Sequence, residues 1–284
     1  MKNTTYTKVP TQKIRANNGV TYAYRDLGDP VGVPLVAVTH LSANLDNWDP
    51  EVIDGLARHQ RVITFDYQGV GSSSGRVPTS IQGMASDTLN FIKIMHLTKV
   101  NLLGFSMGGM VVQEMLLQQP ELAQHVILAG TGPRGGQGIE HVTKISDLDL
   151  LRAIFTLTDI KTTLFFTRTE NGKTSAKQFL KRLKRLKRRQ QQRDRTISWV
   201  AYRRQLKAIN RWGRDKPADL SGITQPVLIL NGDHDRMVPT EPNTYDLHRQ
   251  LTNSQLVIYP DAGHGGIFQN GPDFVKRANE FLAE

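Results

Sequence analysis

The chain has 284 residues, of which 38% are hydrophobic and 22% are charged, a composition typical of a globular protein with a large core. It contains no cysteine, which excludes disulfides, thiolate zinc sites and a cysteine nucleophile. The formal net charge is +10, but residues 171–216 hold 17 basic and two acidic residues, so the rest of the chain is acidic.

The first 130 residues alternate between short apolar strands and helices. A hairpin is expected first, with strands at 12–14 and 20–24 and a turn at Asn18-Gly19. The elements expected after it are strands at 35–38, 62–65, 100–103 and 126–129 and helices at 51–58, 80–96 and 106–118. Continuous apolar strands separated by helices predict a mostly parallel sheet with helices on both faces.

This alternation stops after Gly130 and resumes at Pro226. Residues 131–138 have loop composition, and from 139 to 216 the apolar residues recur at helical spacing. Strands at 227–230 and 256–259 and a helix at 272–282 complete the pattern. We therefore predict an α/β core of residues 1–132 and 217–284, with a doubly wound sheet of about eight strands. Residues 133–216 are predicted to form an inserted α-helical cap, in which Trp199, Tyr202 and Trp212 pack the helices together.

Ser106 lies in Gly104-Phe105-Ser106-Met107-Gly108, between a predicted strand and a predicted helix. A serine hydroxyl becomes a nucleophile when a base, a group that orients the base and donors for an oxyanion surround it. The flanking glycines suit a sharp turn, where a side chain would collide with neighbouring backbone. In this strand-then-helix context, the pattern favours a nucleophile over a purely structural turn.

Two other polar loops follow predicted strands. Asp233 and Asp235 come after the strand at 227–230, and His264 comes after the strand at 256–259. The carboxyl ends of parallel strands meet at one edge of a sheet, where such sheets bind ligands. We interpret His264 as the base, with a structural loop histidine as the alternative, and His234 as a loop residue.

These motifs, with the segment Asp66-Tyr67-Gln68-Gly69-Val70-Gly71-Ser72-Ser73, resemble the α/β-hydrolase fold superfamily over residues 20–132 and 217–284. The resemblance implies a triad of Ser106, Asp235 and His264, in which Asp235 matches the second aspartate of a Gly-Asp-x-Asp pattern. Asp233 is the competing acid, and its alternative role is a turn aspartate that bonds its own backbone. A serine at position 106 argues against haloalkane dehalogenases and epoxide hydrolases, whose nucleophile is a carboxylate.

The resemblance also implies an oxyanion hole formed by the backbone N–H groups of Met107 and Leu41. The family usually has glycine where this chain has Leu41, so the leucine side chain is expected to affect the shape of the pocket. Trp48 matches a tryptophan that often follows in the family. His40, Ser42 and Trp48 are further candidate pocket residues.

The predicted cap has two notable segments. The apolar segment 150–166 is a candidate roof of the pocket through Phe155, Phe165 and Phe166, with ordinary cap core as the alternative. The basic run 181–193 fits a solvated amphipathic helix. This interpretation is favoured over an acidic partner, substrate or surface, and over nucleic acid, since the run lacks the interleaved aromatic residues that stack on bases.

Together these features predict a carboxylesterase-like serine hydrolase that cleaves an ester, lactone or related acyl bond of a small, partly apolar substrate. Two alternatives are a cofactor-free haloperoxidase (perhydrolase) with the same triad and a non-catalytic ligand-binding or interaction module. No metal and no organic cofactor is expected. No stretch is apolar enough to span a membrane and the start has no apolar signal segment, so a cytoplasmic location is expected. The oligomeric state is left open.

Overall fold

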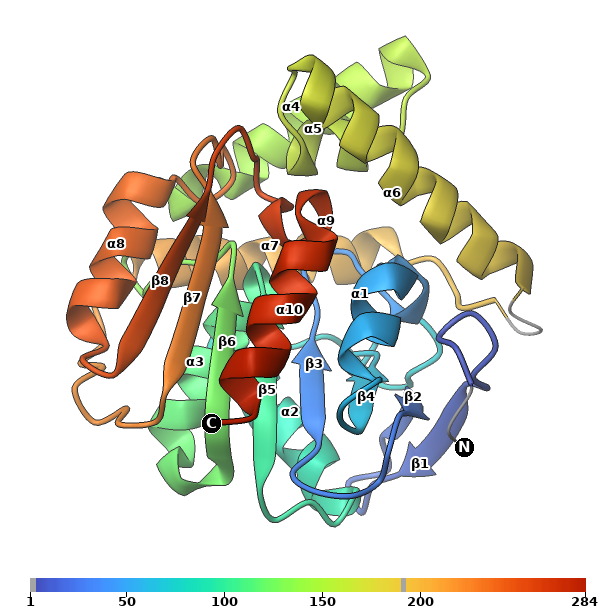
Figure 1. The fold of residues 1–284 in the computed structure, drawn as a ribbon, viewed down its shortest axis with the longest axis vertical. Helices are drawn as coiled ribbons and strands as arrows, with labels where there is room; N and C mark the ends of the chain where they lie inside the picture. The colour runs from blue at the N-terminus through green and yellow to red at the C-terminus, as the bar shows by residue number, and fades with distance from the viewer. Residues whose placement is uncertain (1–3, 190–192) are drawn as a thin grey trace.

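A computed structural model describes residues 4–189 and 193–284 (Figure 1). Its centre is one sheet in the order β1-β2-β4-β3-β5-β6-β7-β8. The eight strands are β1 (Gln12–Arg15), β2 (Thr21–Leu27), β3 (Leu35–Val38), β4 (Val62–Phe65), β5 (Val100–Phe105), β6 (Ala123–Ala129), β7 (Val227–Gly232) and β8 (Ser254–Tyr259). Neighbours from β4 to β8 are parallel, whereas β2 is antiparallel to both β1 and β4. The predicted hairpin and the mostly parallel sheet are confirmed.

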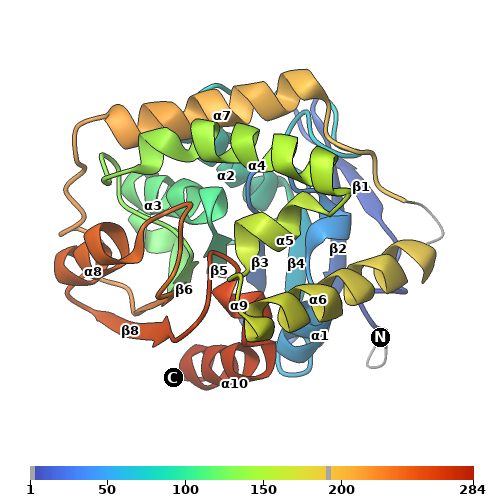
Figure 2. The same ribbon diagram turned by 90° about the horizontal axis from the view of Figure 1, so that it is seen from above.

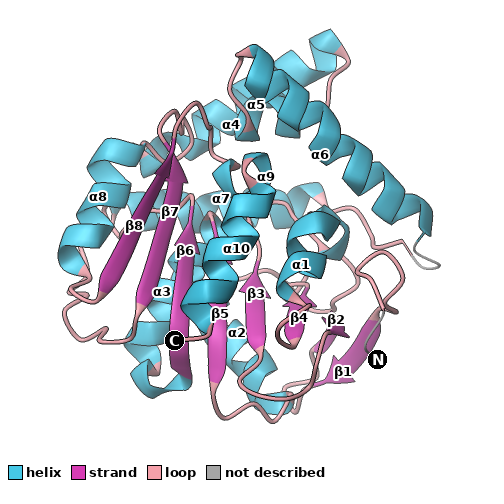
Figure 3. Ribbon diagram, in the orientation of Figure 1, coloured by secondary structure: helices cyan, strands magenta, loops and turns pink. Residues whose placement is uncertain are grey.

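Helices cover both faces of this sheet (Figure 3). One face carries α1 (Pro50–Leu56), α9 (Gly266–Gln269) and α10 (Gly271–Leu282), and the other carries α2 (Ile81–Ile94), α3 (Met107–Gln118) and α8 (Thr240–Gln250). Side chains of a strand alternate between the faces, so Leu103 and Phe105 of β5 pack on the first face and Leu102 on the second. The doubly wound fold class is thereby confirmed.

Four helices between β6 and β7 lie over the carboxyl end of the sheet (Figures 1 and 2). They are α4 (Val142–Thr156), α5 (Ile160–Phe165), α6 (Glu170–Arg189) and α7 (Trp199–Arg214), and we call them the cap. Leu206 and Ile209 of α7 belong to the same hydrophobic cluster as α2 and α3. Because α7 shares that core, the limits of the two units at residues 132 and 217 stay predictions.

Helix α6 carries most of the basic run and is strongly amphipathic. Leu183 and Leu186 are buried, and most of the lysines and arginines of residues 181–189 are exposed. Arg182 is the exception, since its guanidinium lies 2.6 Å from the buried carboxylate of Asp49, at the start of α1. This pair joins α6 to the core. Residues 190–192 of the run lie outside the described residues.

The apolar pattern does not predict every element. Short 3-10 helices occur at Leu45–Asn47, Pro120–Leu122 and Ile139–His141, and α8 was not expected at all. Of the eleven residues of α8, only Thr240, Asn243, Thr244 and Leu247 are buried. Because three of these four residues are polar, the helix has no apolar stripe that the sequence pattern reveals.

A buried carboxyl group on α2 predicts a pH-dependent stability. Asp87 accepts hydrogen bonds from the hydroxyl of Tyr22 and, at 3.3 Å, from the backbone N–H of Gln68. Burial raises the pKa of Asp87 from 3.8 to about 6. The folded chain therefore keeps a proton that the unfolded chain releases, and stability from this group is lost as the pH rises from about 4 to about 6.

Replacement of Asp87 by asparagine removes this titration while keeping an oxygen acceptor. Relative to wild type, the Asp87→Asn variant is expected to gain up to about 3 kcal/mol in free energy of unfolding between pH 4 and pH 7. Urea unfolding at the two pH values measures the change. A difference between the two proteins that is the same at both pH values would contradict the prediction.

Candidate active site

Ser106 occupies a sharp turn between β5 and α3. Its φ is +58°, which is unfavourable for a residue with a side chain and is typical of strained functional turns. A Cβ at Gly108 would lie 2.0 Å from the carbonyl oxygen of Val38, and one at Gly104 would lie 2.6 Å from the Cα of Gly109. The two glycines of the motif are therefore required for the close approach of α3 to the sheet.

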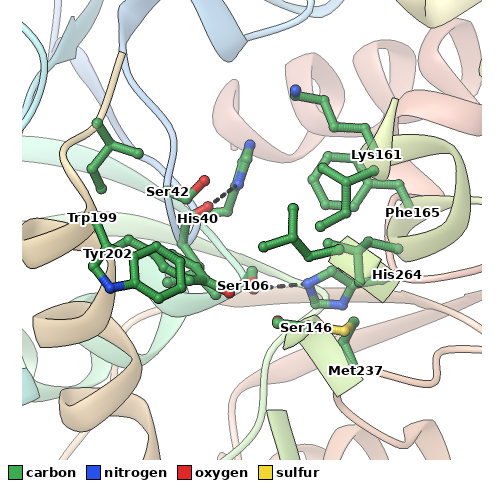
Figure 4. A pocket seen from close by; sticks show the side chains of 15 residues that line it. His40, Ser42, Ser106, Ser146, Lys161, Phe165, Trp199, Tyr202, Met237 and His264 are labelled. Atoms are coloured by element: carbon green, nitrogen blue, oxygen red, sulfur yellow. Dashed lines mark hydrogen bonds between the residues drawn. The ribbon is translucent and has the colours of Figure 1, made fainter. Parts of the chain in front are cut away.

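Three side chains from three loops form a continuous hydrogen-bonded chain. The Nε2 atom of His264 lies 2.8 Å from Oγ of Ser106 (Figure 4). The Nδ1 atom of His264 lies 2.7 Å from Oδ2 of Asp235. All three residues are buried. Because Asp235 accepts the Nδ1–H of His264, Nε2 is left free to accept the hydroxyl proton of Ser106.

The two candidate acids differ clearly in their surroundings. Oδ1 of Asp235 accepts the N–H groups of Met237 and Val238, at 2.7 and 3.0 Å, which aims its other oxygen at His264. Asp233 instead contacts His234 at 2.6 Å and the N–H of Ala262 at 3.2 Å. Burial opposes ionisation of Asp233, but these hydrogen bonds outweigh it and lower its pKa. Asp233 is thus placed as a turn residue that does not touch His264.

The N–H groups of Leu41 and Met107 are candidate oxyanion donors. Neither has a hydrogen-bond acceptor among the residues that the structure describes. Leu41 lines the same cavity as Ser106, and Met107 directly follows Ser106 at the first position of α3. Free N–H groups at a helix start are suited to bind negative charge.

His40 directly precedes Leu41, and its imidazole ring is buried and neutral. Its centroid is 5.3 Å from that of Phe105 and 5.0 Å from that of Phe165. Its Nδ1–H donates to the carbonyl of Leu41 at 2.9 Å. Burial lowers the pKa of His40 to about 3, so the ring carries no charge near neutral pH.

A cavity of about 380 Å³ lies over Ser106 and His264. The core contributes His40, Leu41 and Ser42 to its wall. The cap contributes a mostly apolar set, which includes Leu150, Ile160, Leu164, Phe165, Trp199 and Tyr202. Figure 4 shows Trp199 and Tyr202 on one side of Ser106 and Phe165 on the other.

Three of the candidate pocket residues do not line the cavity, and for Phe166 the alternative of ordinary cap core holds. Phe155 is 84% exposed, because it lies about 140° around α4 from Leu150, which faces the cavity. Phe166 is buried against Phe179, with ring centroids 5.5 Å apart. Trp48 is buried against Phe268, with centroids 6.5 Å apart, and does not reach the cavity wall.

Other residues of the wall were missed or assigned another role. Trp199 and Tyr202 were expected to pack cap helices, but both line the cavity, and Trp199 is 61% exposed. Trp212 is buried in the cluster that includes α2 and α3 and donates its indole N–H to the carbonyl of Gly132. Ile160 and Leu164 are four residues apart in the segment predicted as a roof, a spacing that marks one helix face. Ile197 and Met237 lie in loops, where no spacing identifies them.

The comparisons with known proteins agree with this fold and assign the family. Residues 33–271 match the model of the alpha/beta hydrolase fold family, and the chain belongs to that family. An alpha/beta hydrolase fold protein from Chitinophaga pinensis has 35% sequence identity and a TM-score of 0.92, over 98% of this chain and 99% of that one.

Two named relatives from the same comparisons point to different reactions. A putative non-heme chloroperoxidase of Synechocystis is 29% identical over 254 residues, which cover 85% of this chain and 87% of the relative. A pimeloyl-[acyl-carrier protein] methyl ester esterase of Aliivibrio salmonicida is 25% identical over 88% of this chain and 92% of the relative. The family supports a hydrolase in general, and at these identities the reaction of each relative is said of that relative alone.

Among residues 4–189 and 193–284, no helix is both long and apolar enough to cross a bilayer.

Proposed function

We propose that this protein is a serine hydrolase that cleaves a carboxylic ester, lactone or related acyl bond of a small, partly apolar substrate. The observation that carries the proposal is the hydrogen-bonded chain from Ser106 through His264 to Asp235 at the floor of a cavity. The apolar cap residues around that cavity favour a substrate with an apolar part.

The proposed reaction proceeds in two halves. His264 takes the proton of Ser106 at Nε2 while Oγ bonds to the substrate carbonyl carbon, and the N–H groups of Leu41 and Met107 bind the resulting oxyanion. The intermediate collapses, the leaving alkoxide takes the proton from His264, and an acyl-enzyme remains. Water then loses a proton to His264 and attacks the acyl carbon, and as the second intermediate collapses His264 returns that proton to Oγ of Ser106 and the acid is released. Asp235 holds the imidazole and stabilises its charged form throughout.

The test combines active-site labelling with a substrate panel. A fluorophosphonate probe is expected to label Ser106, as located by peptide mass spectrometry, and p-nitrophenyl esters and lactones of graded chain length are expected to be hydrolysed. The chain-length dependence then defines the substrate class. A protein that is neither labelled nor active on any member of the panel would be a binding module, and the proposal would be wrong.

A second candidate, perhydrolysis, is favoured by the chloroperoxidase name of the Synechocystis relative. In that reaction hydrogen peroxide replaces water and takes the acyl group from Ser106 as a peracid. The peracid then oxidises a halide ion to hypohalous acid and returns to the carboxylic acid, and the hypohalous acid halogenates a bystander molecule. Halogenation of monochlorodimedone that requires acetate, peroxide and halide together would support it. If the protein hydrolyses esters but no halogenation is detected, perhydrolysis is excluded and the hydrolase proposal remains.

A further inference from the structure

The loop that carries Leu41 ends in a turn with an unusual backbone conformation. The N–H of Ala43 donates to the carbonyl of His40 at 3.3 Å and closes a four-residue turn. Ser42, the third residue, has a φ of +62°, whereas Leu41 is not in the left-handed region. A positive φ at the third residue alone is the pattern of a type II turn, where glycine is the usual residue. Since Ser42 has a Cβ, other contacts must hold this conformation.

Two side chains hold the peptide that links Leu41 to Ser42. The carbonyl of Leu41 accepts the Nδ1–H of His40 at 2.9 Å, and the N–H of Ser42 donates to Oε1 of Gln205 at 2.8 Å. Type I and type II turns differ mainly by rotation of this central peptide through about half a turn. The two hydrogen bonds therefore select between two alternative conformations of the loop.

Gln205 comes from a distant part of the chain. It lies on α7 of the cap and its side chain is wholly buried. Among the described residues, its Nε2 has no hydrogen-bond partner. Exchange of its two amide atoms would place a donor against the N–H of Ser42, so the contact with Ser42 fixes the orientation of the amide.

We propose that Gln205 is a positioning residue for the oxyanion hole, through which the cap holds the Leu41–Ser42 peptide and keeps the Leu41 N–H available to the reacting carbonyl. The inference rests on the proposed function of that N–H. The N–H of Leu41 belongs to the preceding peptide, but rotation of the Leu41–Ser42 peptide breaks the hydrogen bonds to His40 and Gln205 that hold the loop, and so frees the segment that carries the donor. In this chain a contact from the cap does what a glycine in the turn would do by itself.

The main test is the Gln205→Met variant, which keeps the shape of the side chain and removes the acceptor. Its kcat for a p-nitrophenyl ester is expected to fall by about tenfold or more, with KM changed by less than about twofold, because the oxyanion is bound only in the transition state. Asn210→Leu is the matched control: it lies on the same helix and loses an amide hydrogen bond to the carbonyl of Glu140. That control is expected to retain wild-type kcat.

A Ser42→Gly background separates positioning from general packing. Glycine adopts a positive φ without strain, so Gln205→Met is expected to cost less than about threefold in kcat there. An equal loss in both backgrounds, or full kcat in Gln205→Met, would overturn the inference. A crystal structure of Gln205→Met supplies a readout besides activity: a negative φ at Ser42 is expected, and an unchanged φ would also overturn it.

Failure of the proposed function would look different from failure of this inference. A wild-type protein that neither reacts with the fluorophosphonate nor hydrolyses the panel removes the proposed function, and the role of Leu41 with it. A wild-type protein that is active, with Gln205→Met equally active and Ser106→Ala inactive, removes only the inference.

Discussion

The Ser106→Ala variant is expected to lower kcat for ester hydrolysis by about 10⁴- to 10⁶-fold. The change removes only Oγ, the atom that lies 2.8 Å from Nε2 of His264. No acyl-enzyme forms without that atom, and the activity that remains comes from substrate binding and the oxyanion donors. Single-turnover and steady-state assays with p-nitrophenyl esters measure the loss.

Folding of this variant supplies its control. Alanine has a Cβ as serine does, so the strain of a φ of +58° is the same in both proteins. The free energy of unfolding is expected to change by less than about 1 kcal/mol, as measured by urea titration. Activity within tenfold of wild type in a folded variant would place the nucleophile elsewhere.

The Asp235→Asn variant is expected to lower kcat by about 10⁴-fold through the wrong histidine tautomer. Met237 and Val238 direct their N–H groups at one oxygen of residue 235, so an asparagine must place its carbonyl oxygen there. Its NH₂ group then faces Nδ1 of His264. The ring is forced to accept at Nδ1 and to carry its proton at Nε2, where it no longer accepts from Ser106.

Asp233→Asn is the matched control for this change. Asp233 lies two residues away on the same loop, is partly exposed and bonds to His234 and Ala262 instead of His264. Its kcat is expected to stay within about threefold of wild type. Equal losses in the two variants would refute the assignment of Asp235 as the acid, and a loss confined to Asp233→Asn would reverse it.

The sequence predicted the candidate catalytic residues on the sheet better than the cap residues that line the cavity, for a physical reason. Buried parallel strands are continuous apolar runs, and the loops that follow them must meet at one edge of the sheet. The positions of Ser106, Asp235 and His264 at that edge therefore follow from local patterns. The strain at Ser106 and the close approach at Gly108 also follow from the spacing of the glycines.

The cap could not be predicted in the same way, because the rotation of each helix about its axis depends on its neighbours. An apolar residue on such a helix faces the core, the cavity or solvent with no difference in the sequence pattern. Phe155 was a candidate for the cavity wall, with cap core as the alternative, and is exposed, whereas Trp199 was expected in the cap core and lines the cavity. Gln205 carried no sequence pattern at all, since its contact with Ser42 spans 163 residues.

Because the cap and the sheet contribute different residues to the site, the substrate preference of this protein can evolve separately from its candidate catalytic groups. The groups proposed to make and break bonds lie on loops of the sheet, while Leu150, Ile160 and Leu164 come from α4 and α5. Substitutions at these three positions alter which molecules fit without touching the hydrogen bonds of His264. New substrate preferences are thus accessible by single mutations on the cap, with turnover chemistry retained, and these positions are the natural choice for a directed-evolution library.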